Sequence, residues 1–216
     1  PSYYVARETR KHVTVALNGD GGDENFAGYP RYLAQKLMSF SALKLTSKLA
    51  NLVIPSLGAA DPKSFFTRLK RFTAVAGLNP AQRYLHWQLC FNAANRQILY
   101  SPQMKATLTH PAENYLLDIY NNARADNSLD RMLYTDVNSY LPEDLLVKMD
   151  IASMANSLES RSPFLDHKLM EFSAGIPAGL KLKGLTLKYI LKQALKGFLP
   201  DEILMRGKMG FGVPIS

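Results

Sequence analysis

The chain has 216 residues, of which 47% are hydrophobic and 20% are charged, so it can bury a core in one or two domains and is not a disordered protein. Its net charge of +8 is dispersed, without a basic arm, zinc-finger spacing or RNA-binding signature, so we expect a small polyanionic ligand rather than nucleic acid. The sequence has no long uncharged apolar run to span a membrane, and its single cysteine, Cys90, indicates a buried thiol in a reduced, cytoplasmic setting.

The predicted elements are mostly helices, preceded by one strand. Residues 1–11 predict a short helix, and the β-branched run at 13–17 predicts a buried strand of a parallel sheet. Apolar residues then recur every three and four positions, which predicts helices over 31–40, 41–53, 62–75, 80–88, 111–122 and 128–140. Because no second convincing strand follows, we expect its partner strands to come from sequence outside this chain.

An acidic, glycine-rich loop follows the strand, with the sequence Asn-Gly-Asp-Gly-Gly-Asp-Glu over residues 18–24. Ligands of open α/β sheets bind beyond the carboxyl ends of the strands, and glycines let a backbone approach a ligand closely. The loop lacks the Gly-Lys-Ser/Thr ending of a phosphate loop and the spacing of a calcium loop. Its carboxylates could hold Mg²⁺ beside a nucleotide, handle protons or bind an amine. A solvated acidic turn is the alternative, but the position after a strand favours a site.

A further helix is predicted over residues 141–157, with Pro142 in its first turn. Asp150 in this helix has mostly apolar neighbours three and four positions away, and an acid on such a face is costly without a partner. We therefore expect Asp150 either to pair with a distant cation or to belong to a site.

The segment over residues 158–166, Leu-Glu-Ser-Arg-Ser-Pro-Phe-Leu-Asp, is expected to be irregular. Its proline disfavours helical backbone at the residue before it, which would hold Glu159 and Arg161 with limited freedom. Asp166 is expected to cap a helix over residues 167–174.

The last predicted helix has Thr186 as its N-cap and stops at Gly197. Lys188 would lie in its first turn, where a cation opposes the helix dipole. A bound anion would offset that cost, because helix N-termini attract phosphates and carboxylates. A row of solvent-exposed lysines is the alternative, and it is the preferred interpretation for Lys192 and Lys196.

Four segments, in this order, resemble the glutamine-hydrolysing asparagine synthetases: 18–29 (Asn-Gly-Asp-Gly-Gly-Asp-Glu…Gly-Tyr), 148–166 (Lys-Met-Asp…Leu-Glu-Ser-Arg-Ser-Pro-Phe-Leu-Asp), 188–191 (Lys-Tyr-Ile-Leu) and 206–211 (Arg-Gly-Lys-Met-Gly-Phe). The resemblance implies that residues 1–216 are a mainly α-helical, C-terminal part of an α/β synthetase domain. That domain is of the ATP-pyrophosphatase type, HUP-like, with a Rossmann-type parallel sheet. The implied reaction activates aspartate with ATP and Mg²⁺ as β-aspartyl-AMP. Ammonia then attacks, supplied from glutamine by an N-terminal glutaminase domain, and a homodimer would be compatible with this assembly.

The resemblance also implies roles for individual residues. Asp20 would serve formation of the acyl-adenylate and the ammonia step, and Lys188 would neutralise the departing pyrophosphate. Three consecutive residues would contact ATP: Leu17, Asn18 and Gly19. Five charged residues would shape the aspartate and adenylate pocket: Asp23, Glu24, Asp150, Glu159 and Arg161. Asp23 would also be the candidate metal ligand.

The chain departs from the family pattern in three ways. Asn18 stands where serine is usual, and the chain contains neither a Ser-Gly-Gly-x-Asp-Ser pyrophosphate loop nor an N-terminal catalytic cysteine. We therefore expect the isolated chain to be inactive. The alternatives are a related amidotransferase or β-lactam synthetase-like ligase acting on another carboxylate, and a non-catalytic helical nucleotide-binding module. Tyrosine tends to occupy the position of Asp20 in the β-lactam synthetases, so the acid favours an amide-forming enzyme.

Overall fold

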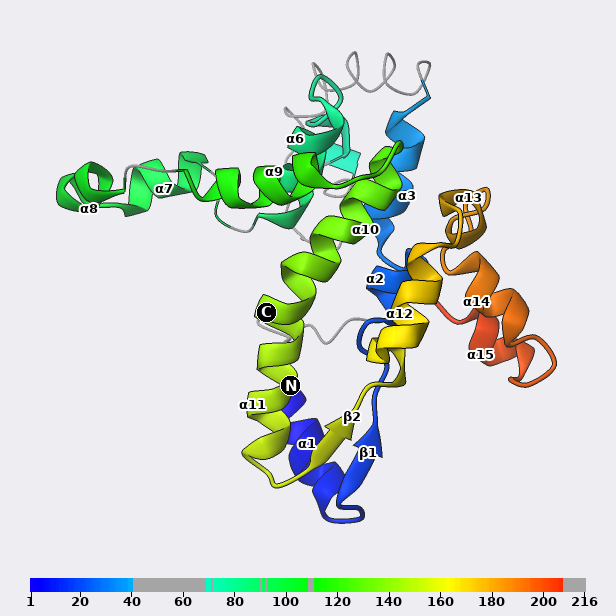
Figure 1. The fold of residues 1–216 in the computed structure, drawn as a ribbon. Coiled ribbons are helices and arrows are strands. Elements are labelled where there is room, and N and C mark those ends of the chain that lie inside the picture. The colour runs from blue at the N-terminus through cyan, green and yellow to red at the C-terminus, as the bar shows by residue number, and fades with distance from the viewer. Residues whose placement is uncertain (41–68, 71, 90, 92, 109–110, 208–216) are drawn as a thin grey trace. The chain divides into compact units, whose positions relative to one another are not determined.

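The structure is a computed structural model, and it describes residues 1–40, 69–70, 72–89, 91, 93–108 and 111–207 (Figure 1). The chain divides into two compact units. The first unit is formed by Pro1–Tyr29 together with Asp136–Ser216, and the second by Pro30–Thr135. The first unit contains all the residues that the sequence proposes for a site. None of the described helices is long and apolar enough to cross a bilayer.

The first unit contains a two-stranded parallel sheet. Strand β1 (Val15–Leu17) pairs with β2 (Glu159–Arg161), so that Val15 lies opposite Glu159 and Leu17 opposite Arg161. The prediction that the first strand finds its partner only outside this chain was therefore wrong, as was the irregular segment predicted around Glu159. The Glu-Ser-Arg sequence of β2 does not predict a strand, because it contains none of the β-branched or aromatic residues that are enriched in strands.

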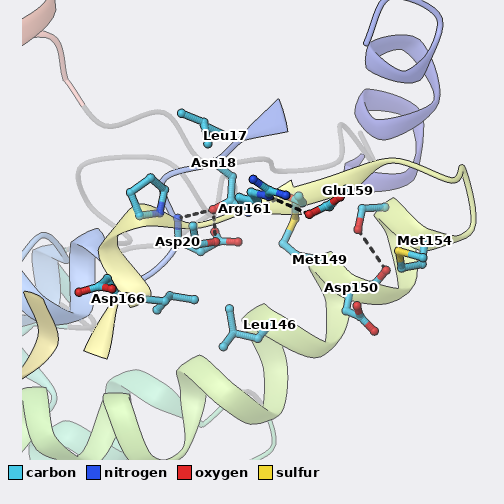
Figure 2. Close-up of a pocket in the computed structure, with 15 residues that line it drawn as sticks. Leu17, Asn18, Asp20, Leu146, Met149, Asp150, Met154, Glu159, Arg161 and Asp166 are labelled. Atoms are coloured by element: carbon cyan, nitrogen blue, oxygen red, sulfur yellow. Dashed lines mark hydrogen bonds and ion pairs between the residues drawn. The ribbon is translucent and has the colours of Figure 1, made fainter. Parts of the chain in front are cut away.

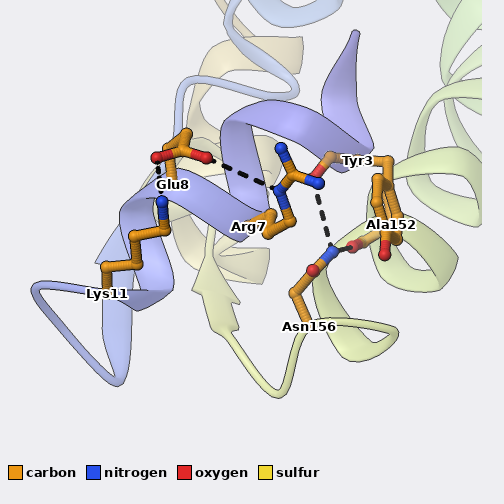
Figure 3. Close-up of polar contacts among 6 residues, drawn as sticks. All are labelled: Tyr3, Arg7, Glu8, Lys11, Ala152 and Asn156. Atoms are coloured by element: carbon orange, nitrogen blue, oxygen red, sulfur yellow. Dashed lines mark hydrogen bonds and ion pairs between the residues drawn. The ribbon is translucent and has the colours of Figure 1, made fainter.

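Helix α1 (Ser2–Arg10) precedes β1 and packs against α11 (Val147–Met154). Asn156, just beyond α11, donates from Nδ2 to the carbonyl of Tyr3 at 3.3 Å and to that of Ala152 at 2.9 Å (Figure 3). The ion pairs that Glu8 makes with Arg7 on α1 and with Lys11 just beyond it are exposed, and such pairs contribute little to stability. The asparagine therefore ties α1 to the end of α11 through backbone carbonyls.

One continuous helix was predicted over residues 141–157, and the structure has two helical segments there. A π-helix, η2 (Leu141–Leu146), leads directly into α11. Its second residue is Pro142, which has no N–H to donate to a regular helical ladder. π-helical turns occur frequently at functional sites, because they shift the side chains that follow relative to a regular helix.

The remaining helices of the first unit follow the acidic loop and β2. They are α2 (Gly22–Phe26), η3 (Pro163–Leu165), α12 (His167–Ala174), α13 (Ala178–Lys181), α14 (Tyr189–Ala194) and α15 (Asp201–Met205). Both α12 and α14 contact α2. The predicted cap of α12 is confirmed, since Asp166 Oδ1 accepts from the N–H groups of Lys168 and Leu169 at 3.0 and 3.2 Å.

The predicted start of the last long helix was wrong. Helix α14 begins at Tyr189, and its N-cap is Lys188, which has left-handed backbone with φ of 53°. Thr186 instead exchanges two backbone hydrogen bonds with Lys183, at 2.9 and 3.2 Å. This small turn uses the backbone groups with which Thr186 would otherwise open the helix. Lys188 therefore precedes the first turn of a helix of only six residues, and the dipole argument made for it loses force.

The second unit is helical in the part that the structure describes. Its helices are α3 (Pro30–Met38), α6 (Pro80–Gln88), α7 (Ala93–Leu99), α8 (Pro102–Thr107), α9 (Ala112–Asn122) and α10 (Ser128–Asn138), the last of which continues into the first unit. Buried Arg83 on α6 donates to Gln35 on α3 at 2.8 Å, and Tyr84 stacks on Tyr120 of α9. These helices confirm the predictions made at 31–40, 80–88, 111–122 and 128–140. The helix predicted at 41–53, most of that at 62–75, and Cys90 lie outside the described residues.

Candidate active site

The acidic glycine loop packs against the segment that follows β2. Gly21 has φ of 86°, and a Cβ there would lie 2.4 Å from Cδ2 of Leu165. A Cβ on Gly22 would lie 3.2 Å from the ring of Phe164. Both glycines therefore let η3 approach the backbone of the loop closely. This packing brings the first two family-like segments of the sequence together in one place.

Asn18 links the loop to β2 through its side-chain amide. Its Nδ2 donates to Oγ of Ser160 at 2.7 Å, and its Oδ1 accepts from the hydroxyl of Ser162. The same Oδ1 accepts from the N–H of Asp20 at 3.1 Å, and the N–H of Asn18 donates to the carbonyl of Arg161 at 2.8 Å. Asn18 is thus engaged with protein groups on three sides, beside the carboxylate of Asp20.

The carboxylate of Asp20 is half-buried. Its Oδ2 is shielded from solvent, and no residue in the described part of the chain donates a hydrogen bond to it. Burial raises the pKa of this carboxyl above its ordinary value; the charge of Lys148 lowers it and the charge of Asp23 raises it. A carboxylate without a partner is costly in such a place, which is the condition expected of a group that meets a ligand, a metal ion or a proton.

A cavity of about 650 Å³ opens beside Asp20 (Figure 2). Its lining comes from the end of β1, from β2 and the residues after it, and from η2 and α11. Six of the residues proposed from the sequence line it: Leu17, Asn18, Asp20, Asp150, Glu159 and Arg161. The volume is within the range of small-ligand sites, roughly 300–1,000 Å³. The cavity therefore lies at the carboxyl ends of this parallel pair of strands, where ligands of open α/β sheets bind.

Two charged groups on β2 lie at this cavity as an ion pair. Arg161 Nε is 2.7 Å from Oε1 of Glu159, and both side chains are more than half exposed. Asp150 also lines the cavity and is exposed to solvent. The burial cost that the sequence suggested for Asp150 therefore does not arise, and its neighbours Val147 and Met154 are exposed as well.

Lys188 reaches the acidic loop through Asp23. Its Nζ is 2.9 Å from Oδ1 of Asp23, with 30% and 22% of the two side chains exposed. Gly28 makes this contact sterically feasible, because a Cβ there would lie 1.9 Å from Oδ1 of Asp23 and 2.3 Å from Cε of Lys188. Lys188 therefore contacts the loop to which Asp20 belongs. The cavity formed by the described residues is lined by Asp20 and not by Lys188.

Glu24 is buried behind the loop, with 1% of its surface exposed. It accepts a hydrogen bond from the hydroxyl of Tyr29 at 2.5 Å. Burial raises the pKa of Glu24, and it also raises that of Tyr29, to which the neighbouring Glu24 charge adds. Glu24, Asp23 and Gly19 do not line the cavity as the described residues form it. This geometry gives Glu24 a part in holding α2 to the chain that follows.

The described residues contain no group of three or more His, Cys, Asp or Glu side chains arranged to hold a metal ion. Mg²⁺ commonly takes one or two carboxylates and completes its shell with water and substrate phosphates. The shielded Oδ2 of Asp20 is a carboxylate oxygen suited to be such a metal ligand, whereas Oδ1 of Asp23 already contacts Lys188. The loop can therefore supply a carboxylate to a metal ion that a phosphate ligand brings with it.

Three residues near Asp20 were not predicted from the sequence to belong to a site. Ser160 and Ser162 bond Asn18, and Lys148 acts on the charge of Asp20. The serines could have been found by recognising β2, since alternate residues of a strand share a face. For Lys148 the sequence holds no comparable signal, because its effect depends on how α11 packs.

The chain is similar to known proteins over its whole length. The family model described as asparagine synthase matches residues 1–216. The protein named asparagine synthetase (glutamine-hydrolyzing) 1 of Bacillus subtilis is 34% identical over all of this chain, which covers 33% of that relative. A putative asparagine synthetase (glutamine-hydrolyzing) of Mycobacterium tuberculosis is also 34% identical over the whole chain, which covers 32% of it. Amidase chyE of Penicillium rubens is 27% identical over 94% of the chain and 32% of its own length.

No solved structure gives a significant match. The chain spans about a third of the length of the curated relatives that it matches. The family match nevertheless covers every residue, including the loop of Asp20, strand β2 and Lys188. The chain therefore belongs to the asparagine synthase family, a carbon–nitrogen ligase family of the ATP-pyrophosphatase class.

Proposed function

We propose that the full-length protein forms an amide from a carboxylic acid that ATP has activated as its acyl-adenylate, with aspartate as the acid and glutamine-derived ammonia as the nitrogen donor. The observation that carries this proposal is the convergence of the acidic loop and β2 on the cavity, with the shielded carboxylate oxygen of Asp20 beside it. The match to glutamine-hydrolysing asparagine synthetases supports the choice of substrates.

Asp20 can act in the amide-forming step as a general base. Its raised pKa makes it a better proton acceptor than an ordinary aspartate. As ammonia attacks the activated carbonyl carbon, the new C–N bond forms and the C–O bond to the nucleotide phosphate breaks. AMP leaves with that electron pair, and Asp20 accepts the proton that the nitrogen loses.

The ion pair on β2 suits an amino-acid substrate. Aspartate carries an ammonium group and an α-carboxylate, which are complementary to Glu159 and Arg161. The pair is exposed at the cavity with its two partners 2.7 Å apart, so a zwitterion can exchange for it with both charges matched. This arrangement leaves the side-chain carboxylate of aspartate free to point toward Asp20 and the nucleotide.

Lys188 supplies positive charge on the phosphate side of the reaction. Its ammonium is held at the acidic loop by Asp23, so little reorganisation is needed when phosphate charge develops next to it. A metal ion bound through the phosphates would add further charge neutralisation when present, and the carboxylates of the loop are suitable ligands for it.

A related ligase that amidates another carboxylate is the second candidate. The similarity to a protein named amidase chyE favours it, because that name differs from the asparagine synthetase names of the other relatives. Asp20 and the zwitterion-matching pair on β2 favour aspartate over an acid that has no amino group.

The test uses the full-length protein with ATP, Mg²⁺ and a panel of acids: aspartate, glutamate, succinate and β-alanine derivatives. Acid-dependent ATP–pyrophosphate exchange and amide formation from ammonia or glutamine are measured separately. We expect aspartate alone to support both, with asparagine as product. ATP–pyrophosphate exchange with another acid would refute aspartate as the substrate. The absence of exchange with every acid in the panel would refute adenylate formation.

A further inference from the structure

The register of the parallel pair explains why two serines meet one asparagine. Ala16 lies opposite Ser160, so continuing the ladder by two residues places Asn18 opposite Ser162. Residues two apart in a strand project from the same face. Asn18 and the two serines therefore share one face at the carboxyl ends of β1 and β2, and all three line the cavity.

The amide of Asn18 is suited to this position because it is branched. Its Nδ2 bonds one serine, while its Oδ1 accepts from the other serine and from the N–H of Asp20 at 3.1 Å. A backbone N–H can only donate, so the Oδ1 assignment follows from that contact. Both acceptor positions of Oδ1 are in use, and one N–H of the amide remains. A serine at position 18 offers a single oxygen and cannot span these partners.

We propose that Asn18, Ser160 and Ser162 form a clamp that positions the carboxylate of Asp20 in the cavity. We call these three residues the Asn18 clamp, and its two serines are positioning residues rather than catalytic ones. The clamp joins segments 142 and 144 residues apart in the chain, next to an acid whose Oδ2 makes no hydrogen bond to a described residue. The kinetic consequence of the clamp rests on the proposed amide-forming function.

In the clamp, Asn18 has a role that differs from the expected one. The family resemblance implies that Asn18 contacts ATP, but most of the hydrogen-bonding capacity of its side chain is directed to the protein. Loss of the clamp should therefore affect the chemical step more than nucleotide binding. A contact to the nucleotide would have to use the remaining N–H or the backbone.

The kinetic test uses the full-length protein with Ser160→Ala, Ser162→Ala and Ser162→Thr. We expect each alanine variant to lower kcat for asparagine formation about fivefold, because each removes one hydrogen bond (~1 kcal/mol), while KM for ATP changes by less than about twofold. Ser162→Thr keeps the hydroxyl and should restore kcat. Ser39→Ala is the matched control, since it removes a hydroxyl bonded to the carbonyl of Lys36 at 2.6 Å, outside the site.

A double-mutant cycle tests whether the clamp acts as one unit. The variant carrying Asn18→Ala and Ser162→Ala should be no slower than Asn18→Ala alone, because the shared hydrogen bond is already absent. Additive losses would overturn the clamp. An unchanged kcat in the serine variants, or a rise in KM for ATP with kcat unaffected, would also overturn it, the latter by assigning these residues to the nucleotide.

Hydrogen–deuterium exchange gives a measurement that needs no activity. The N–H of Asp20 donates to Asn18, so a peptide containing residues 17–21 should exchange its amide hydrogens faster in Ser162→Ala than in the unmodified protein. In Ser39→Ala the exchange rate of this peptide should be unchanged. Equal exchange in all three proteins would overturn the clamp. If the unmodified protein shows no acid-dependent exchange of pyrophosphate, the proposed function fails, and the clamp is then judged by hydrogen exchange alone.

Discussion

Replacing Gly28 by alanine should break the contact between Asp23 and Lys188. The added Cβ would lie 1.9 Å from Oδ1 of Asp23, 2.8 Å from its Cγ and 2.3 Å from Cε of Lys188, all far inside van der Waals contact. The groups in the way are ends of side chains, so we expect the ion pair to open rather than the backbone to move. The ion pair between the third family-like segment of the sequence and the first would then be lost.

The magnitude follows from the geometry of the pair. At 2.9 Å the two charges attract by about 6 kcal/mol with an effective dielectric constant of ~20. Desolvation offsets most of this, and the side chains are still 30% and 22% exposed, so solvent screens the pair. We expect Gly28→Ala to lower the free energy of unfolding by about 1–2 kcal/mol and pyrophosphate exchange by about tenfold or more.

Denaturant unfolding and ATP–pyrophosphate exchange of the full-length protein measure the two effects. Gly179→Ala is the matched control, because Gly179 lies in α13 with no atom within 4 Å of the added Cβ; it should be neutral or stabilising by up to about 1 kcal/mol. In an Asp23→Ala background the cost of Gly28→Ala should shrink, since the obstructing carboxylate is gone. An equal cost in both backgrounds, or full stability and exchange in Gly28→Ala itself, would refute the reasoning.

Four further outcomes are expected. Asp20→Asn should lower amide formation by at least about 100-fold, measured as asparagine produced, because a general base is lost. The same substitution should also raise the melting temperature near pH 7. Burial raises the pKa of Asp20 in the folded protein above 3.8, so ionisation of this carboxyl lowers the stability of the unmodified protein as the pH rises. Below pH 3.8 the gain in melting temperature should vanish, and a gain that does not depend on pH would contradict this cause. Lys188→Met should slow pyrophosphate exchange about 100-fold or more, with partial recovery in Lys188→Arg because the positive charge returns, and unchanged exchange in Lys188→Met would refute the role of that charge. The isolated chain of residues 1–216 should neither hydrolyse glutamine nor yield asparagine in amino-acid analysis, and detection of either product would refute the expected need for a glutaminase domain and a pyrophosphate loop.

Local signals in the sequence were enough for much of the fold. The period of apolar residues placed α6, α9 and α10, and Asp166 was recognised as a cap from its position before an apolar helix. The loop of Asp20 was also recognisable, because glycines and acids directly after a β-branched run are unusual for a simple turn. These signals are local, since each depends on residues within a few positions of one another.

Strand β2 and the start of α14 needed the tertiary structure. Glu159 and Arg161 form a strand because β1 supplies the hydrogen bonds, not because of their own propensity. Lys188 has left-handed backbone at the N-cap, and the turn closed by Lys183 and Thr186 lies shortly before it. In both places long-range or neighbouring backbone contacts override what the local residues favour.

Local patterns in the sequence were sufficient to predict several of the helices and the acidic loop. The folded structure was needed to show that Asp20 lines the cavity with Arg161, that Lys188 contacts Asp23, and that Asn18 bonds Ser160 of β2 and Ser162 just after it. The physical reason is that composition and periodicity report which face of an element is buried, whereas the partner of a polar group is set by how distant segments pack. A site made from segments more than 140 residues apart is therefore complete only once the chain has folded.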